Sequence, residues 1–149
     1  MAAIRILVVD DHNLVRQTLC GFLNAEPDME VVCEARGGLQ AIRKAEKYQP
    51  DVVVLDIGIP ELNGLNATPL IKQVAPNTEI LVVSQYEDSF FARRAFAGGA
   101  RGFITKTHVK AELIKAVKQV HAKKRFLGQQ VKLEPEYSVD DPGLGPVQL

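Results

Sequence analysis

Five polar residues share one kind of position in this sequence. Each ends or directly follows an apolar run that has the composition of a buried strand: Asp10, Asp11, Asp56, Ser84 and Lys106. Three carboxylates held close together repel one another, so we expect a cation between them, and oxygen ligands favour a hard ion such as Mg²⁺. An aspartate can also attack phosphorus and form an acyl phosphate, whose oxygens an ammonium and a hydroxyl can hold. These residue types therefore predict Mg²⁺-assisted phosphoryl chemistry.

Alternating strands and helices must position these residues. We expect strands over Ile4–Val9, Val31–Glu34, Val52–Leu55, Ile80–Ser84 and Gly102–Thr105. Several of the runs are continuously aliphatic, as in a parallel strand that is covered on both faces. We expect helices over Leu14–Ala25, Leu39–Tyr48, Pro69–Val74, Ser89–Ala97 and Lys110–Lys124. Strict alternation with short connections predicts an α/β fold, a doubly wound five-stranded parallel sheet with helices on both faces.

The five polar residues belong to one edge of that predicted sheet. In such folds ligands bind beyond the carboxyl ends of the strands, where the strand order reverses. Each residue also has an ordinary structural interpretation. A single aspartate at a strand end, such as Asp56, is usually a helix cap, and Asp10 and Asp11 could both cap the first helix. Ser84 could be a turn residue and Lys106 a solvated charge. The required groups at four strand ends together favour a site over four unrelated structural roles.

Pro69 falls where the third helix is expected. Proline is tolerated in the first turn of a helix and disrupts later turns. We therefore expect this helix to begin late, with Thr68 as its cap and Pro69 at its first position.

Length and composition limit the class of protein. The chain has 149 residues, of which 46% are hydrophobic and 24% charged, which fits one folded domain and argues against general disorder. No apolar run approaches the ~20 residues of a membrane span. The first apolar run ends at Asp10, so it is no signal peptide, and Cys20 and Cys33 cannot form a disulfide framework. We therefore expect a cytoplasmic protein that does not associate with membranes.

Charge is balanced over the chain but not along it. Equal numbers of acidic and basic residues, 18 of each, argue against wholesale nucleic-acid binding. Beyond residue 127 the sequence is rich in proline and glycine, and acids outnumber bases: Glu134, Glu136, Asp140 and Asp141 against Lys132. We expect residues 1–127 to form the domain and residues 128–149 to be an extended acidic tail or a truncated linker.

A basic stripe surrounds the last predicted helix: Lys110, Lys115, Lys118, Lys123, Lys124 and Arg125. A solvated face is the first interpretation of such a charge run, and a docking surface for a partner is the second. DNA binding is a weak third interpretation, because no base-reading motif accompanies the stripe.

Four stretches carry a resemblance to the receiver domain of two-component response regulators, which has the CheY-like fold. They are Ile6–Asp11, Pro50–Gly64, Leu81–Ser84 and Ala97–Lys106, in the order and spacing of that family. The resemblance covers about residues 3–125 and implies the strand order 2-1-3-4-5. The stretches Asp11–Arg16, Ser84–Tyr86 and Arg125–Leu127 resemble the NarL/FixJ type of regulator.

The resemblance implies a phosphorylation site and a metal site. Asp56 would be the phosphoacceptor, and Lys106 would pair with its phosphoryl group. Asp11, Asp56 and the backbone carbonyl of Gly58 would bind Mg²⁺ directly, whereas Asp10 would act mainly through a metal-bound water.

The same resemblance implies switch and lifetime residues. Ser84 would hydrogen-bond a phosphoryl oxygen, and Phe103 occupies the aromatic switch position. Phe103 has an equal alternative as an ordinary core aromatic, because it lacks a hydroxyl for an outward hydrogen bond. Gly58 and Tyr86 would flank the path of attacking water and tune the lifetime of the phosphoryl group.

The implied function is that of a phosphoacceptor signalling domain, not of an enzyme. A sensor histidine kinase or a phosphotransfer protein would supply the phosphoryl group, and the domain would then change its interaction surface. The resemblance suggests a homodimer through the fourth helix, fifth strand and fifth helix, or through the first and fifth helices. NarL/FixJ members usually continue into a helix-turn-helix domain, which nothing after Leu127 resembles. We therefore expect no nucleic-acid binding by this chain as given. The alternative function is that of the receiver part of a DNA-binding transcriptional regulator whose helix-turn-helix domain is missing from this chain.

Three rival functions make different demands on the sequence. A phosphatase with an aspartyl-phosphate intermediate usually has a second aspartate two residues after the nucleophile, where this chain has Gly58. A flavodoxin-like cofactor binder needs a loop rich in Gly, Ser or Thr after the first strand, where this chain has Asp10-Asp11-His12. A degenerate receiver used only as a scaffold would lack the key residues that are present here.

Overall fold

Six parallel strands form one sheet in the computed structural model, which describes residues 2–87, 89–129 and 131. Their order is β2-β1-β3-β4-β5-β6, so the predicted order of five strands is confirmed and a short sixth strand is added. The pairings are parallel throughout. The strands are β1 Ile4–Val9, β2 Met29–Ala35, β3 Val52–Asp56, β4 Glu79–Ser84, β5 Gly102–Thr105 and β6 Phe126–Leu127.

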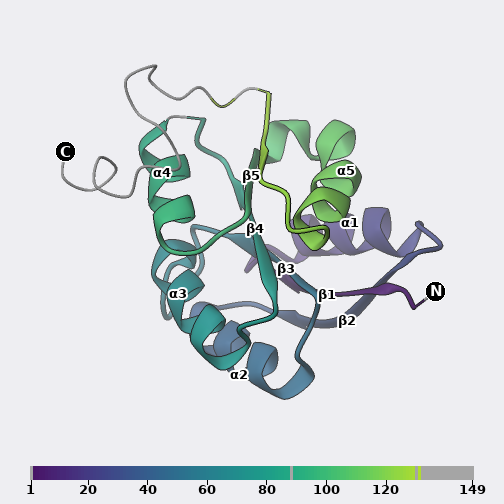
Figure 1. Ribbon diagram of the computed structural model, residues 1–149, viewed down its shortest axis with the longest axis horizontal. Coiled ribbons are helices and arrows are strands. Elements are labelled where there is room, and N and C mark those ends of the chain that lie inside the picture. The colour runs from purple at the N-terminus through teal and green to yellow at the C-terminus, as the bar shows by residue number, and fades with distance from the viewer. Residues whose placement is uncertain (1, 88, 130, 132–149) are drawn as a thin grey trace.

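Helices cover both faces of the sheet, as predicted. Figure 1 shows α1 and α5 on one face and α2, α3 and α4 on the other, with the sheet between the two layers. A one-turn 3₁₀ helix, η1, joins β5 to α5. The helices are α1 Asn13–Asn24, α2 Gly38–Tyr48, α3 Gly64–Val74, α4 Ser89–Ala97, η1 Lys106–His108 and α5 Val109–His121.

Strand β3 shows why the central strands are continuously aliphatic. Successive side chains of a strand point to opposite faces. Val53 and Leu55 therefore belong to the buried cluster under α2, α3 and α4, whereas Val52 and Val54 belong to the cluster under α1 and α5. With both faces covered, every position of β3 is buried, and its last residue, Asp56, is carried into the protein with the rest.

Helix α3 begins at Gly64, so the prediction of a late start at Pro69 was wrong. Asn63 is the N-cap, and its side chain accepts a hydrogen bond from the amide of Asn66 at 2.9 Å. The hydroxyl of Thr68 does not cap the helix but donates to the carbonyl of Gly64 at 2.8 Å. Pro69 removes one amide donor from the helix interior, a cost of about 3 kcal/mol that the capped first turn and the buried face of α3 outweigh.

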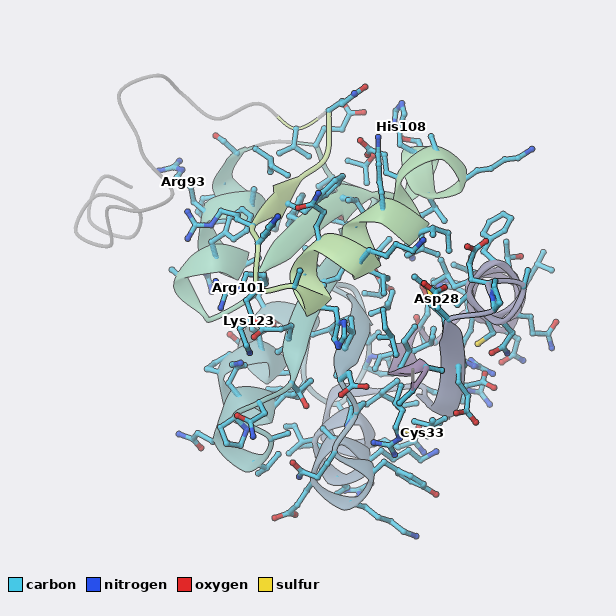
Figure 2. All side chains as sticks on the ribbon, turned by 45° about the vertical axis from the view of Figure 1, so that its right-hand side comes forward. Asp28, Cys33, Arg93, Arg101, His108 and Lys123 are labelled. Carbon is cyan, nitrogen blue, oxygen red and sulfur yellow. The ribbon has the colours of Figure 1, made fainter. Side chains whose placement is uncertain are left out.

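The two ends of the sheet differ in chemistry. At the amino end of β4, the buried side chain of Glu79 forms two ion pairs. Its Oε1 lies 3.1 Å from Arg101 Nε and its Oε2 lies 3.3 Å from Lys123 Nζ. Figure 2 shows Arg101 and Lys123 close together, well away from His108, which follows the carboxyl end of β5. The Glu79 cluster closes the amino end of the sheet and leaves the carboxyl end for the site.

The described chain continues past the predicted domain end at residue 127. Gly128 and Val131 are both buried against the domain. Residues 130 and 132–149 of the predicted acidic tail lie outside the described residues. Among the residues that the structure describes, no helix combines the length and the apolar character needed to cross a membrane.

Candidate functional site

The carboxyl ends of β1, β3 and β5 bring Asp10, Asp56 and Lys106 into contact. Val9 and Leu55 are register partners in the paired strands β1 and β3, so the residues that follow them are neighbours. Lys106 Nζ lies 3.0 Å from Asp10 Oδ2 and 3.3 Å from Asp56 Oδ2. Asp10 is fully buried and Asp56 is almost so. One ammonium group therefore bridges two buried carboxylates contributed by different strands.

Asp11 completes an acidic cluster with Asp10 and Asp56. One ligand atom from each of these residues and from His12 lies within 4.8 Å of the others. His12 Nδ1 is 3.3 Å from both Asp10 Oδ1 and Asp11 Oδ1. No role for His12 was predicted from the sequence. Its position next to the aspartate pair is a signal, but a sequence does not show which way an imidazole turns.

Neither aspartate of the pair is the cap of α1. The N-cap is His12, which makes no side-chain capping hydrogen bond. Asp10 Oδ1 instead accepts a hydrogen bond from the amide of His12 at 2.9 Å, which fixes the turn between β1 and α1. This leaves Asp10 Oδ2 directed to Lys106.

The charges in the cluster are not balanced. Burial raises the pKa of Asp56, and the charge of Asp10 adds to the rise, although Lys106 opposes it. Burial works against the charge of Lys106, but its close contact with Asp10 and the charge of Asp56 raise its pKa overall. Two carboxylates share one ammonium, so the ionised form of Asp56 calls for more positive charge nearby.

A tight loop after β3 fixes the carboxylate of Asp56. The amide of Gly58 points to Asp56 Oδ1 at 3.4 Å, and the amide of Gly64 donates to the carbonyl of Ile57 at 2.8 Å. A Cβ atom on Gly64 would collide with the carbonyl oxygen of Asp56. Glycine at position 64 therefore lets α3 begin directly against the end of β3.

Ser84 ends β4, Tyr86 lies in the loop that follows it, and Phe103 lies in the neighbouring strand β5. Ser84 is buried, and its Oγ accepts a hydrogen bond from the amide of Tyr86 at 2.9 Å. The ring of Tyr86 stacks on Phe91 of α4, with 4.7 Å between centroids. Phe103 is fully buried in the core and pairs in register with Val82. The hydroxyl of Ser84 is thus linked through its neighbour Tyr86 to the first turn of α4.

A pocket of about 100 Å³ opens over the cluster. It is lined by His12, Asp56, Ile57, Gly58, Gln85, Tyr86 and Lys106. The pocket thus gathers the predicted acceptor, Lys106, Gly58 and Tyr86 around one opening, whereas Phe103 lies in the core. Its size suits a small group such as a phosphoryl, not a nucleotide or a flavin.

The donor set fits a hard divalent cation. Asp10 Oδ2 and Asp11 Oδ1 are shielded from solvent and accept no well-directed hydrogen bond within the described residues, although Lys106 Nζ lies 3.0 Å from the first. Buried carboxylate oxygens of this kind normally have a partner. Carboxylate oxygens and a backbone carbonyl are the ligands that Mg²⁺ prefers, so the residues present match that ion.

Comparison with known proteins identifies the family of this chain. The family model described as "Response regulator receiver domain" matches residues 6–118. The chain belongs to this family. The receiver resemblance predicted from the sequence is therefore confirmed, and the flavodoxin-like cofactor binder is excluded. An acidic cluster at this place is typical of the Mg²⁺ site of receivers, and receiver domains are phosphoacceptor signalling domains that interact with histidine kinases or phosphotransfer proteins.

Individual relatives support the NarL/FixJ-type resemblance. The receiver is 35% identical over 128 residues to the response regulator GacA of Pseudomonas viridiflava, covering 86% of this chain and 60% of that protein. It is 38% identical over 117 residues to the transcriptional regulatory protein DegU of Brevibacillus brevis, covering 78% of this chain and 50% of DegU. The receiver thus spans 50–60% of the length of these two relatives.

Solved structures agree with this assignment. A LuxR-family two-component response regulator from Aurantimonas sp. SI85-9A1 superposes with a TM-score of 0.83 at 34% identity, covering 87% of this chain and 93% of that one. The response regulator domain of CheB from Thermotoga maritima gives a TM-score of 0.75 at 37% identity, covering 80% and 97%. This receiver is therefore part of a two-component response regulator.

Proposed function

We propose that this receiver accepts a phosphoryl group on Asp56 from a sensor histidine kinase or a phosphotransfer protein. The observation that carries the proposal is the bridge from Lys106 Nζ to Asp10 and Asp56, at 3.0 and 3.3 Å, beside a pocket of phosphoryl size. The bridge holds a nucleophile and a cation for the transferred oxygens within contact of each other.

The transfer requires the ionised form of Asp56. Its carboxylate oxygen attacks phosphorus, the phosphorus–nitrogen bond to the donor histidine breaks, and the imidazole nitrogen keeps the electron pair and takes a proton. Lys106, whose ammonium form is favoured by both aspartates, lies where it can pair with the new phosphoryl oxygens. The domain thereby assists its own phosphorylation without being an enzyme that turns over a substrate.

Asp11, Asp56 and the carbonyl of Gly58 would hold Mg²⁺ directly, with Asp10 acting through a water. The ion would supply the positive charge that the transferred oxygens and the paired carboxylates need. Support comes from two buried oxygens, Asp10 Oδ2 and Asp11 Oδ1, which accept no well-directed hydrogen bond within the described residues. Lys106 Nζ lies 3.0 Å from the first and His12 Nδ1 lies 3.3 Å from the second.

Ser84 is the group through which phosphorylation would reach the surface. Its Oγ is bonded to the amide of Tyr86, and turning toward a phosphoryl oxygen would release that amide. Tyr86 stacks on Phe91, so the start of α4 would move with it. Such a change shifts an equilibrium between two arrangements of the loop after β4 and the start of α4. The buried ring of Phe103 on β5 would then move in response to Ser84.

Gly58 and Tyr86 would set the lifetime of the phosphoryl group. Both line the pocket, and Gly58 is exposed, with no atom within 4 Å of the place that a Cβ would take. An attacking water can therefore approach between them. A larger side chain at position 58 would narrow this approach.

We propose self-association as the output, through either of two faces. A groove of about 360 Å³ between α1 and the start of α5 is mostly apolar, and Leu14 on its border is 76% exposed. The α4–β5–α5 face is the second candidate, but β6 occupies the edge of β5 in this structure. The groove between α1 and α5 is thus the face that is already open.

The decisive experiment is an intact-mass measurement with acetyl phosphate and Mg²⁺. The wild-type mass should rise by one phosphoryl group of about 80 Da, and Asp56→Asn should abolish the rise. Asp28→Asn is the matched control, because Asp28 is exposed and lies outside the acidic cluster. An unchanged wild-type mass with several donors, or an undiminished rise in Asp56→Asn, would contradict the assignment.

The alternative function, the receiver part of a DNA-binding transcriptional regulator, has one observation in its favour. DegU is named a transcriptional regulatory protein, and this chain matches 50% of its length. The described residues contain the receiver alone, so the chain as given is expected to show no sequence-specific retention of DNA. Specific retention by the isolated chain would place the output within the receiver itself.

A further inference from the structure

The chain returns to the sheet after α5 and covers the edge of β5. Phe126 and Leu127 pair with Gly102 and Phe103, and the amide of Gly128 donates to the carbonyl of Phe103 at 2.8 Å. We name residues Phe126–Gln129 with Val131 the terminal strap. In Figure 1 this yellow-green segment runs beside β5, between α4 and α5. Without it, β5 would be an edge strand with unpaired backbone groups.

Glu112 anchors the strap from the inner side of α5. Its side chain is buried, and Oε2 accepts a hydrogen bond from the amide of Gln129 at 3.0 Å. Oε1 has no hydrogen-bond partner within the described part of the chain. Burying a carboxylate costs free energy unless hydrogen bonds compensate for it. An apolar side chain at position 112 would avoid this cost but could not accept the hydrogen bond from the strap.

Gly128 fits between Glu112 and β5 because it has no side chain. A Cβ atom there would lie 2.9 Å from Glu112 Oε1 and 3.3 Å from the Cα of Ile104. The backbone of the strap therefore lies directly on β5, and a larger residue at this position must displace either the carboxylate of Glu112 or the strap.

The strap touches the elements that would respond to the phosphoryl group. Its hydrogen bond goes to the carbonyl of Phe103, whose ring is fully buried. Val131 is buried in the same cluster as Phe103 and Phe96, and the ring of Phe91 packs against that cluster. In this structure the docked strap thus occurs together with the hydrogen bond from the amide of Tyr86 to Ser84 Oγ.

We propose that the terminal strap is a built-in latch that stabilises the form of the receiver without a phosphoryl group and keeps the edge of β5 closed. This inference rests on the proposed phosphorylation of Asp56. When Ser84 turns toward the phosphoryl group, the packing around Phe103 and the start of α4 changes. This change weakens the docking of the strap on β5. Coupling between two sites is reciprocal, so loosening the strap strengthens binding at the phosphorylation site by the same factor.

The latch can be tested with variants that leave the acidic cluster untouched. Gln129→Pro removes the backbone amide that donates a hydrogen bond to Glu112 Oε2. Gln129→Ala is its matched control, because alanine keeps that amide. Gly128→Ala places a Cβ 2.9 Å from Glu112 Oε1 and so disturbs the contact between Glu112 and the strap. Gly21→Ala is its control, since a Cβ at position 21 has no atom within 4 Å. None of these positions lines the pocket over the acidic cluster.

Two measurements are compared for each variant. Amide hydrogen exchange without any phosphodonor reports docking. Exchange at residues 126–128, whose amides are present in every variant, should rise in Gln129→Pro and Gly128→Ala but not in the controls. Equilibrium binding of beryllofluoride with Mg²⁺, a phosphoryl mimic, reports coupling. The two strap variants should bind it about fivefold more tightly than wild type and the controls.

The outcomes separate the latch from the proposed function. Unchanged exchange in both strap variants, or raised exchange with unchanged beryllofluoride affinity, overturns the latch. If wild type neither binds beryllofluoride nor gains mass with acetyl phosphate, the proposed function fails, and the latch, which rests on it, falls with it. Raised exchange together with tighter binding in both variants supports the latch.

Discussion

Glu61 caps helix α2 from the loop that follows β3. Its Oε1 accepts a hydrogen bond from the amide of Gln40 at 3.2 Å, and the carbonyl of Pro60 accepts one from the amide of Gly38 at 3.0 Å. The N-cap residue of α2 is Gly37, which has no side chain to do this. The loop that follows β3 is thereby tied to the neighbouring helix α2, and this geometry requires a positive φ of 71° at Glu61.

Removing the cap should lower the stability of the domain. Glu61→Ala is expected to cost about 1 kcal/mol, because the first turn of α2 loses an acceptor. Glu61→Gly should be less harmful than Glu61→Ala by about 1 kcal/mol, since glycine adopts a positive φ without strain. Urea unfolding measures both values, with Glu46→Ala on the exposed side of α2 as the control. Equal stability of the alanine and glycine variants would show that φ strain is absent in solution.

Asp56 should destabilise the metal-free domain at neutral pH. Folding raises the pKa of this carboxyl, chiefly through burial and then through Asp10. Its contribution to stability is therefore present below the ordinary value of 3.8 and is lost as the pH rises through the raised folded value. In buffer with a chelator, Asp56→Asn should melt at a higher temperature than wild type at pH 7, and the difference should vanish at low pH. A variant that melts below wild type at pH 7 would reverse the assigned sign.

Magnesium should stabilise the wild-type domain by binding the acidic cluster. At a free Mg²⁺ concentration of 100 times Kd, the free energy of unfolding should rise by about 2.7 kcal/mol. Asp11→Asn removes a charged ligand that is a third exposed, so this rise should be much smaller at the same concentration. Thermal melts with and without Mg²⁺ measure it, with Asp28→Asn as the control. An undiminished rise in Asp11→Asn would exclude Asp11 from the ligands.

Gly64→Ala should disrupt the loop that holds Asp56. The added Cβ would collide with the carbonyl oxygen of Asp56 and lie 2.9 Å from the Cα of Ile57, and backbone atoms cannot yield as a side chain can. The expected loss is at least about 2 kcal/mol. Gly21→Ala, in the open on α1, should lose nothing and gain up to about 1 kcal/mol. Denaturant unfolding of the two variants makes the comparison.

The part of the site that follows from strand order was predictable from the sequence. In a parallel sheet the residues after each strand must meet at one edge, so Asp10, Asp56 and Lys106 could be placed together before any distance was known. The family resemblance supplied their roles.

Features that depend on side-chain direction or on competing local signals were not predictable. The cap at Asn63 outweighed Pro69, because a satisfied first turn and a buried helix face count for more than one missing amide. Strand β6 has only two residues, too few for any periodicity to show. The hydrogen bond from Tyr86 to Ser84 and the turn of His12 toward the aspartates depend on rotamers, which residue type leaves open.

The bridge between Asp10, Asp56 and Lys106 can form only after all three residues have been synthesised and the strands that carry them have paired. Asp10 leaves the ribosome well before Lys106, which is made only after β5. Until then, the two aspartates have no ammonium between them, and the pocket beside Asp56 has no wall on that side. A nascent, truncated or partly unfolded chain therefore holds Asp56, the acceptor that we propose, without the ammonium that would assist it. On this proposal, competence to receive a signal arises only once the whole domain has folded.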